Sequence, residues 1–397
     1  MDPDDEFTKT KALLGQYFDK DKCHRYEMEG IIAAGLSGIA WLVRYTGEGR
    51  PRANDSRIVL KIGLKAARKI EQDADEDENA TIETRVGSIA HEGKMLEILR
   101  YARHIVKPIS PENDPLRRRF KRLRPLHMQL GEWLYMEYLE KFVRIPLRVD
   151  EIKRVTSYGS GTLGRFIARA TNDTIVPHPL PNRLLWHIFL CLARMGCAFI
   201  WPPASGGTEF PSPDMSQQAW INLDLHAGNG MLIVEPSSLI HTAANNSRAI
   251  LINNPQEAAA EMVYQAGLLM YGIIIEHPRP QAAAADPRSL DNTAFGTIQL
   301  FPNQDPLQTI QTCAVRLVPD NRGRSPFPTL EDELVILVCR CMARNMLERP
   351  TLAESMQGLI MVNRRGQPYN TRLNAARASR ESDENISLIV QRLIFDA

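Results

Sequence analysis

The chain has 397 residues, enough for two lobes with separate cores, since domains usually contain roughly 100 to 200 residues. Hydrophobic residues make up 44% of the sequence and charged residues 24%, which excludes a chain that is disordered throughout. The net charge of +1 provides no overall field to attract nucleic acid or a membrane surface, so neither is an expected partner. Binding specificity must therefore come from a local site.

Cysteine use and the ends of the sequence bear on the compartment. The 6 cysteines form no CxxC pair and no Cys/His cluster with metal-ligand spacing, so we expect reduced thiols in the core. The acidic N-terminal sequence lacks the basic and apolar regions of a signal peptide, and no run of about 18 apolar residues appears. We therefore expect a soluble intracellular protein, cytoplasmic or nuclear.

The first part of the chain has the patterns of a small sheet with one helix. Residues from about 26 to 63 alternate apolar residues around two glycines and end in the β-rich run RIVLKIG, which predicts paired strands. Residues 81–103 place Met95, Leu96 and Leu99 on one face at helical spacing, which predicts an amphipathic helix.

Beyond residue 140 the patterns are mainly helical. Residues 180–200 are apolar nearly all round, so this helix is expected to be buried. Further helices are expected at 258–275 and 329–345, and a short amphipathic helix at 386–395 is expected near the C-terminus.

A nucleoside triphosphate needs a backbone turn near its phosphates, a cation on them, metal ligands and a carboxylate near the attacking hydroxyl. The segment 33–40, AAGLSGIA, lies between two predicted strands, and its glycines Gly35 and Gly38 allow the backbone to approach phosphate. It resembles the glycine-rich loop GxGxxGxV of protein kinases, with Ala33 in place of the first glycine.

Two charged residues extend this resemblance. Lys61 takes the place of the lysine of the kinase VAIK strand, which would contact the α and β phosphates. Glu92 heads ExxxLxxL on the predicted helix, as does the glutamate of the kinase C-helix that pairs with this lysine. Glu97 is a rival partner for the lysine.

The segment WLYMEYL, from Trp133, predicts a strand that resembles the kinase segment leading into the hinge. The resemblance implies that Met136 is the gatekeeper. It also implies that the backbone of Glu137 and Leu139 hydrogen-bonds adenine.

The strongest local motif is NLDLHAGN, residues 222–229, followed by an apolar segment. It resembles the kinase catalytic loop HRDLxxxN, with Asn222 in place of the histidine. On this resemblance Asp224 accepts or orients the substrate hydroxyl proton, and Asn229 holds a magnesium ion.

The magnesium-binding DFG motif of kinases is missing. If the strand that precedes it is 248–252, the equivalent triplet is 253–255; if the hairpin is short, the triplet is 242–244. Neither contains a carboxylate, and Asn253 would be only a weak metal ligand because an amide oxygen is neutral. The segment 255–261 is also too short for an activation loop and contains no Ala-Pro-Glu.

Later motifs continue the resemblance. The segment 264–272 resembles the kinase F helix, with Met262 where its aspartate is expected. The sequence CMARNMLERPT, from Cys341, is similar to the CMxxDPxxRPT of the family. Its Arg349 would pair in the family with the Ala-Pro-Glu glutamate, so its partner in this chain is an open question.

The resemblance covers residues 26–363 in collinear order and implies an α+β, bilobal protein kinase-like fold. It predicts a small lobe with an antiparallel sheet plus one helix and a larger helical lobe. The expected divisions are an N-terminal extension 1–25, the small lobe 26–139, the large lobe 140–363 with a surface insertion 202–218, and a C-terminal tail 364–397.

Three functions fit these motifs. The one we favour is a pseudokinase that binds ATP between its lobes, has impaired or absent phosphotransfer and works with a protein partner or substrate. The second is an active, divergent Ser/Thr kinase that uses magnesium on Asn229 and Asn253. The third is a small-molecule phosphotransferase, since DLHAGN at 224–229 also resembles the DLHxGN loop of aminoglycoside and choline kinases. ATP is the expected cofactor, and the need for Mg²⁺ is left open.

Overall fold

The structure of the chain is a computed structural model. It describes residues 3–21, 24–35, 38–46, 57–63, 89–111, 114–117, 133–137, 163–173, 179–203, 209, 219–222, 230–234, 240–244, 249–252, 254–275, 295–299, 309–320, 322, 324–356, 375–390 and 392–393. The chain divides into two compact units. Unit 1 comprises Met1–Tyr101, Ile105–Tyr138 and Asn246–Ala249, and unit 2 comprises Ala102–His104, Leu139–Asn245 and Ile250–Ala397.

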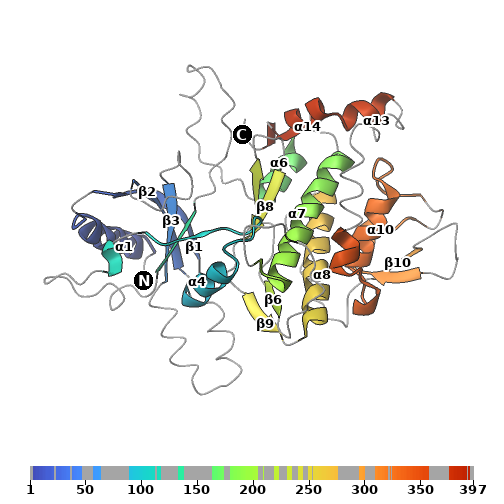
Figure 1. Ribbon diagram of the computed structural model, residues 1–397. Coiled ribbons are helices and arrows are strands. Elements are labelled where there is room, and N and C mark those ends of the chain that lie inside the picture. Colours follow the sequence, from blue (N-terminus) through green and yellow to red (C-terminus); the bar gives the residue numbers. More distant parts are fainter. Residues whose placement is uncertain are drawn as a thin grey trace. The chain divides into compact units, whose positions relative to one another are not determined.

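Unit 1 is built on a five-stranded antiparallel sheet with the strand order β1-β2-β3-β5-β4. Figure 1 labels β1, β2 and β3 of this sheet. The strands are β1 (Tyr26–Gly35), β2 (Gly38–Tyr45), β3 (Arg57–Ile62), β5 (Trp133–Glu137) and β4 (Pro108–Ile109). This confirms the strands expected over residues 26–63 and the strand expected from Trp133.

Both outer strands of this sheet have features that limit pairing with another chain. β4 contains only two residues, and its Pro108 has no N–H to donate. β1 is longer, but its register with β2 shifts between Met28 and Gly30 and again between Ile31 and Ala33. Such irregularities interrupt a regular edge.

The two faces of the sheet pack against different helices. On one face, Trp41 lies opposite Leu60, which lies opposite Tyr135, and these side chains form a core with Leu14 and Tyr17 of helix α1 (Pro3–Phe18). The segment expected as an N-terminal extension, 1–25, therefore supplies a helix to the core of unit 1, and the residue pattern did not predict this helix.

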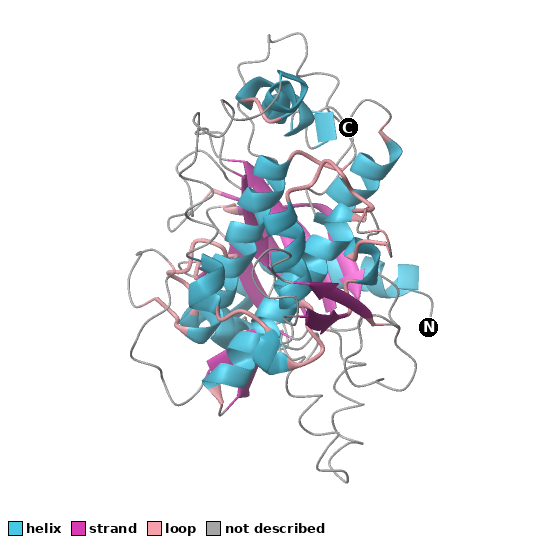
Figure 2. Ribbon diagram, turned by 90° about the vertical axis from the view of Figure 1, so that its right-hand side faces the viewer, coloured by secondary structure: helices cyan, strands magenta, loops and turns pink. Residues whose placement is uncertain are grey.

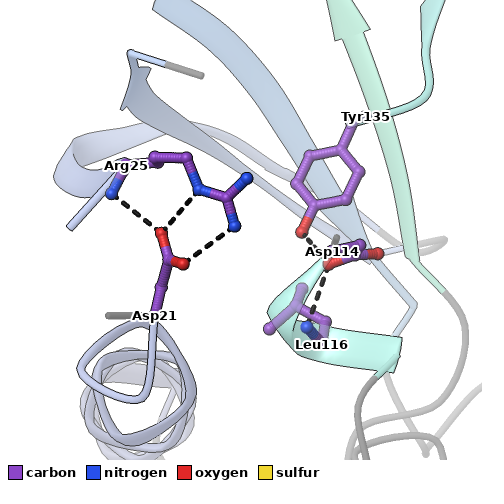
Figure 3. Close-up of polar contacts among 5 residues, drawn as sticks. All are labelled: Asp21, Arg25, Asp114, Leu116 and Tyr135. Carbon is purple, nitrogen blue, oxygen red and sulfur yellow. Dashed lines mark hydrogen bonds and ion pairs between the residues drawn. The ribbon is translucent and has the colours of Figure 1, made fainter. Parts of the chain in front are cut away.

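Two buried carboxylates fix the chain on this same side of the sheet (Figure 3). Asp114 accepts hydrogen bonds from the Leu116 amide at 2.9 Å and from the Tyr135 hydroxyl at 2.8 Å. Asp21, just after α1, binds the backbone and guanidinium of Arg25. These bonds satisfy polar groups that would otherwise destabilise the apolar core.

Helix α4 (Ile89–Ile98) covers the opposite face. A Cβ placed on Gly93 would lie 3.5 Å from Leu134 Cδ1, so the helix runs close over β5. Met95, Leu96 and Leu99 are fully buried, which confirms the apolar helical stripe expected for this segment.

The main elements of unit 2 are helices (Figures 1 and 2). They are α6 (Leu163–Asn172), α7 (Asn182–Ile200), α8 (Pro255–Ile274), α10 (Asp332–Cys341), α13 (Ala375–Arg380) and α14 (Asp383–Val390). Short 3-10 turns lie at η2 (Pro115–Arg117) in unit 1 and at η4 (Val315–Leu317) and η5 (Met346–Glu348) in unit 2.

Small residues allow the helices of unit 2 to approach one another. A Cβ on Gly196 of α7 would lie 3.5 Å from the Met262 Cβ of α8. A Cβ on Gly267 of α8 would lie only 2.6 Å from the Cys341 Cβ of α10. A side chain at position 267 would therefore push the two helices apart.

Helix α7 matches the buried helix expected over residues 180–200. By length and composition it could span a membrane, but 83% of its 18-residue apolar window is buried inside the protein. This burial is consistent with the core helix of a soluble protein.

Short strands pair in three two-stranded sheets. β6 (Ala219–Asn222) pairs with β9 (Ala249–Ile252), β7 (Gly230–Val234) with β8 (Ile240–Ala244), and β10 (Gly296–Gln299) with β11 (Thr309–Thr312). The described residues thus form a mixed α+β structure with a five-stranded antiparallel sheet and helices, which agrees with the expected fold class at this level.

Candidate functional site

The ammonium of Lys61 and the carboxylate of Glu92 form the centre of the candidate site. The Lys61 Nζ atom lies 2.6 Å from the Glu92 Oε2 atom, and the two residues are only 8% and 1% exposed. Glu97, the rival partner, is exposed and pairs instead with Arg100. The ion pair between Lys61 and Glu92 is the one that the sequence analysis expected.

The local structures of β3 and α4 explain why these two side chains meet. Side chains alternate along a strand, so Lys61 points away from the core that contains Leu60 and Ile62. Glu92 belongs to the same helical stripe as Met95 and Leu96, at spacings of three and four residues. The stripe that buries α4 on the sheet therefore also buries the carboxylate beside the lysine.

The glycine-rich hairpin lies beside the end of β3. Gly35 and Gly38 form the last pair of the β1–β2 hairpin, and the two residues between them lie outside the described residues. Further along β2, Ala40 lies opposite Lys61. Gly38 is therefore two residues along β2 from the residue that lies opposite the lysine.

Strand β5, whose end was expected to contact the base, pairs with β3 beside Lys61. Lys61 lies opposite Leu134 of β5, and Glu137 lies three residues further along this strand. At the rise of about 3.3 Å per residue in a strand, this separation is about 10 Å, comparable to the length of a nucleoside. Met136, the expected gatekeeper, lies between these positions, opposite Val59, and is buried.

Glu137 makes two bonds with one residue that the sequence did not suggest. Its amide N–H donates to the Lys107 carbonyl at 2.9 Å, and its Oε1 atom accepts from the Lys107 amide at 2.8 Å. Because the amide is engaged, a base contact from the Glu137 backbone must use the carbonyl oxygen. Leu139, the other expected base contact, lies outside the described residues.

The residues expected to carry out phosphotransfer lie outside the part of the chain that the structure describes. These are Asp224 and Asn229, between β6 and β7, and the weak metal ligand Asn253. The strand expected after the catalytic loop is present as β7.

The strand bounds bear on the two expected positions of the missing DFG motif. Residues 242–244 lie inside β8, which pairs with β7, and therefore do not follow a strand. Strand β9 ends at Ile252, so of the two expected triplets 253–255 is the one that follows a described strand.

Helix α8 begins inside this triplet, at Pro255. Asn254 caps the helix, since its side-chain oxygen accepts from the amides of Gln256 at 3.1 Å and Glu257 at 3.4 Å, and Pro255 is the first helical residue. Only residues 253 and 254 separate β9 from α8. This chain length leaves no room for an activation segment.

Two later positions of the kinase pattern lie in unit 2. Met262, where an aspartate was expected, is 1% exposed and apolar, so no carboxylate projects from this position. Arg349 bonds to the carbonyl oxygens of Ala343 at 3.1 Å and Ala260 at 3.3 Å, and its guanidinium lies 4.5 Å from the Tyr264 ring centroid. Glu261 is more distant, at 3.9 Å.

These contacts answer the open question of the partner of Arg349. In this chain the arginine is bound mainly by backbone carbonyls and an aromatic ring on and near α8. Burial lowers the pKa of Arg349, an effect that the nearby Glu261 carboxylate partly opposes.

A second buried pair of ionisable residues lies in unit 2. The His104 Nδ1 atom lies 2.8 Å from the Glu209 Oε2 atom, and the amides of Arg103 and His104 also bind the Glu209 carboxylate. Glu209 is only 2% exposed, although the sequence placed it in a surface insertion, 202–218. The expectation of a surface position is therefore wrong at this residue, because three bonds to 103–104 bury the carboxylate.

Among the described residues, no group of three His, Cys, Asp or Glu side chains is arranged to hold a metal ion. The described cysteines, Cys191, Cys197, Cys313, Cys339 and Cys341, are all buried, as expected, and none of them forms a disulfide. Comparisons with protein-family models and with curated proteins find no match to this chain.

Proposed function

We propose that this chain is a protein kinase-like, ATP-binding protein whose phosphotransfer is impaired or absent. The observation that carries the proposal is the buried ion pair between Lys61 and Glu92. In protein kinases a lysine on the third strand and a glutamate on the C-helix form this pair, and the lysine binds the phosphates.

The energetics of such a pair favour a binding role over a structural one. Burying two charges costs desolvation energy that their attraction often does not exceed, and apolar residues of similar size stabilise a core as well or better. Lys61 is held by one described partner, Glu92, close to a glycine hairpin whose backbone amides are the groups that phosphates bind.

The sheet supports the placing of an adenine nucleotide along β5. Phosphates bound by Lys61 would place the base about three strand residues away, near the carbonyl of Glu137. On this proposal the two compact units correspond to the small and large lobes of a bilobal kinase-like fold.

The start of α8 supports the loss of phosphotransfer. A kinase places its main magnesium-binding carboxylate in the DFG motif, after a strand that follows the catalytic loop, and then needs an activation segment. Here β9 is followed by two asparagines and then by α8, so the expected carboxylate is replaced by amides. We therefore propose that the protein acts by binding a nucleotide and a protein partner.

The proposal is tested by measuring ATP binding by calorimetry with EDTA and, separately, with magnesium. We expect binding in EDTA that is lost in the Lys61→Met variant and retained in Lys94→Met, in which an exposed lysine of α4 is replaced. No ATP binding by the wild-type protein contradicts the proposal. Magnesium-dependent release of phosphate from ATP would favour the active-kinase alternative.

A further inference from the structure

We propose that the side chain of Glu137 is a positioning residue that holds the base-binding end of β5 in place. This inference rests on the proposed function, because it concerns how the same site would select its nucleotide. It goes further because it assigns a role to a carboxylate that contacts neither phosphate nor base.

The geometry at the end of β5 carries the inference. Glu137 is the last residue of this strand, and its backbone is one of the expected base contacts. Both backbone hydrogen-bonding groups of Lys107 are bound by Glu137, the carbonyl by its amide at 2.9 Å and the amide by its carboxylate at 2.8 Å.

The neighbouring strand explains why a side chain is needed here. β4 has only two residues, and Pro108 lies opposite Met136. Because the Glu137 amide donates to the Lys107 carbonyl, residues 107 and 137 form a hydrogen-bonded pair, in which the Lys107 amide would ordinarily donate to the Glu137 carbonyl. Here the Lys107 amide donates to the Glu137 carboxylate instead. The carboxylate of Glu137 adds a charge-assisted bond at this point, and such bonds are stronger than those between neutral groups.

This arrangement has a consequence for base selection. The amide of Glu137 donates to Lys107, and the Glu137 carboxylate takes the Lys107 amide that would ordinarily bond to the Glu137 carbonyl, so this carbonyl is the backbone group that would accept a hydrogen bond from the base. A carbonyl oxygen accepts a hydrogen bond from the 6-amino group of adenine, whereas the 6-oxo group of hypoxanthine is itself an acceptor and would be repelled. Fixing the direction of this carbonyl would therefore favour ATP over ITP.

The test measures the affinities of ATP, ITP and inorganic tripolyphosphate in EDTA for the wild-type protein and for the Glu137→Ala and Glu137→Gln variants. We expect ATP affinity to fall about tenfold in Glu137→Ala, as for the loss of one good hydrogen bond to a charged group. Tripolyphosphate, which lacks a base, should bind to the variant with unchanged affinity. The preference for ATP over ITP should nearly disappear, because the Glu137 carbonyl is no longer held in place. Glu137→Gln should retain the preference for ATP over ITP, because the side-chain amide oxygen of glutamine can also accept from the Lys107 backbone amide.

Asp114→Ala is the matched control. Like Glu137, Asp114 is a carboxylate that accepts from a backbone amide, that of Leu116, and it also accepts from the Tyr135 hydroxyl on β5. Asp114→Ala should lower the melting temperature without changing the preference for ATP. If Glu137→Ala does not fold, Glu137→Asp replaces it, because the shorter carboxylate cannot span the same distance.

Three results would overturn the inference while ATP binding by the wild-type protein stands. They are an unchanged base preference in the Ala or Asp variant, no rescue by Gln, and an equal loss of preference in Asp114→Ala. If the wild-type protein binds no ATP, the proposed function fails first, and that failure is visible before any variant is compared.

Discussion

Lys61 and Glu92 are 31 positions apart in the chain, yet their charged atoms lie 2.6 Å from each other in a buried environment. Neither the strand nor the helix pattern alone requires this contact. It arises because β5 lies beside β3 in the sheet and α4 packs over that surface.

Removing one member of this pair should destabilise the protein more than removing both. Lys61→Met leaves the Glu92 carboxylate buried without its cation, which should cost about 3 to 5 kcal/mol of unfolding free energy. The double variant Lys61→Met/Glu92→Leu should regain most of this stability, because it replaces the pair by apolar side chains. Urea denaturation measures both, and equal destabilisation by the single and double variants would contradict the expectation.

The Glu209 carboxylate should make the stability of unit 2 sensitive to acid. Burial by itself would raise its pKa, but the hydrogen bonds and charge of His104, with the Arg103 amide, lower the pKa below its ordinary value of 4.5. A carboxyl group with a lowered pKa contributes stability above its unfolded-state pKa, and this stability is lost as pH falls through the folded-state pKa.

We therefore expect the wild-type protein to lose stability as pH falls below about 4.5, with a smaller loss in Glu209→Gln. Thermal unfolding between pH 7 and pH 3 measures this difference. Glu354→Gln, which alters an exposed carboxylate, should retain the wild-type dependence on pH. Parallel curves for the wild-type and Glu209→Gln proteins would show that the pair has no such effect.

Glu381 supplies the cap that the N-terminus of α7 lacks. The capping residue of this helix is Pro181, which makes no side-chain cap bond, and the Glu381 carboxylate binds the amides of Asn182 at 2.8 Å and Arg183 at 2.9 Å. These residues are about 200 positions away from Glu381, so the cap also attaches the C-terminal segment to α7.

Glu381→Ala should lower the unfolding free energy by about 1 to 2 kcal/mol, as for other lost helix caps. Asp383→Ala is the matched control, because Asp383 also contacts Arg183 but its side chain is 78% exposed. It should change stability by less than about 0.5 kcal/mol. Calorimetry measures the unfolding free energy of both variants. Equal losses in the two would show that the burial of Glu381 does not make its contacts stronger than those of Asp383.

Gly267 and Gly15 should respond in opposite ways to alanine. The added Cβ of Gly267→Ala would lie 2.6 Å from the Cys341 Cβ, so the variant should lose about 1 to 3 kcal/mol through overpacking. Gly15 lies in α1 with nothing within 4 Å of the added Cβ, and Gly15→Ala should gain up to about 1 kcal/mol from helix propensity. Melting temperatures that fall or rise together would contradict this contrast.

Much of the local structure could be predicted from the sequence. The apolar stripe of Met95, Leu96 and Leu99 predicts α4, and the alternation around residues 57–62 predicts β3, because each pattern depends only on neighbours along the chain. Helix α1 was missed, since its charged residues obscure the few side chains, Leu14 and Tyr17 among them, that enter the core.

The contacts between distant segments could not be predicted in the same way. Glu209 lies in a stretch rich in Pro, Gly and Ser that is typical of a surface loop, and only its bonds to residues 103 and 104 bury it. Likewise, the partners of Arg349 are backbone carbonyls, and no sequence motif records which carbonyl an arginine will reach.

The sequence by itself determined β3, α4 and α7, the order of the motifs that resemble those of kinases, and the lack of an Asp-Phe-Gly motif, because these depend on residue type and spacing. The tertiary structure decided which charges are paired, that Lys61 takes Glu92 over Glu97, and that Glu137 holds Lys107. The physical reason is that an ion pair or a cap depends on distance in space, which is set by the packing of whole elements and not by the residues beside it in the chain.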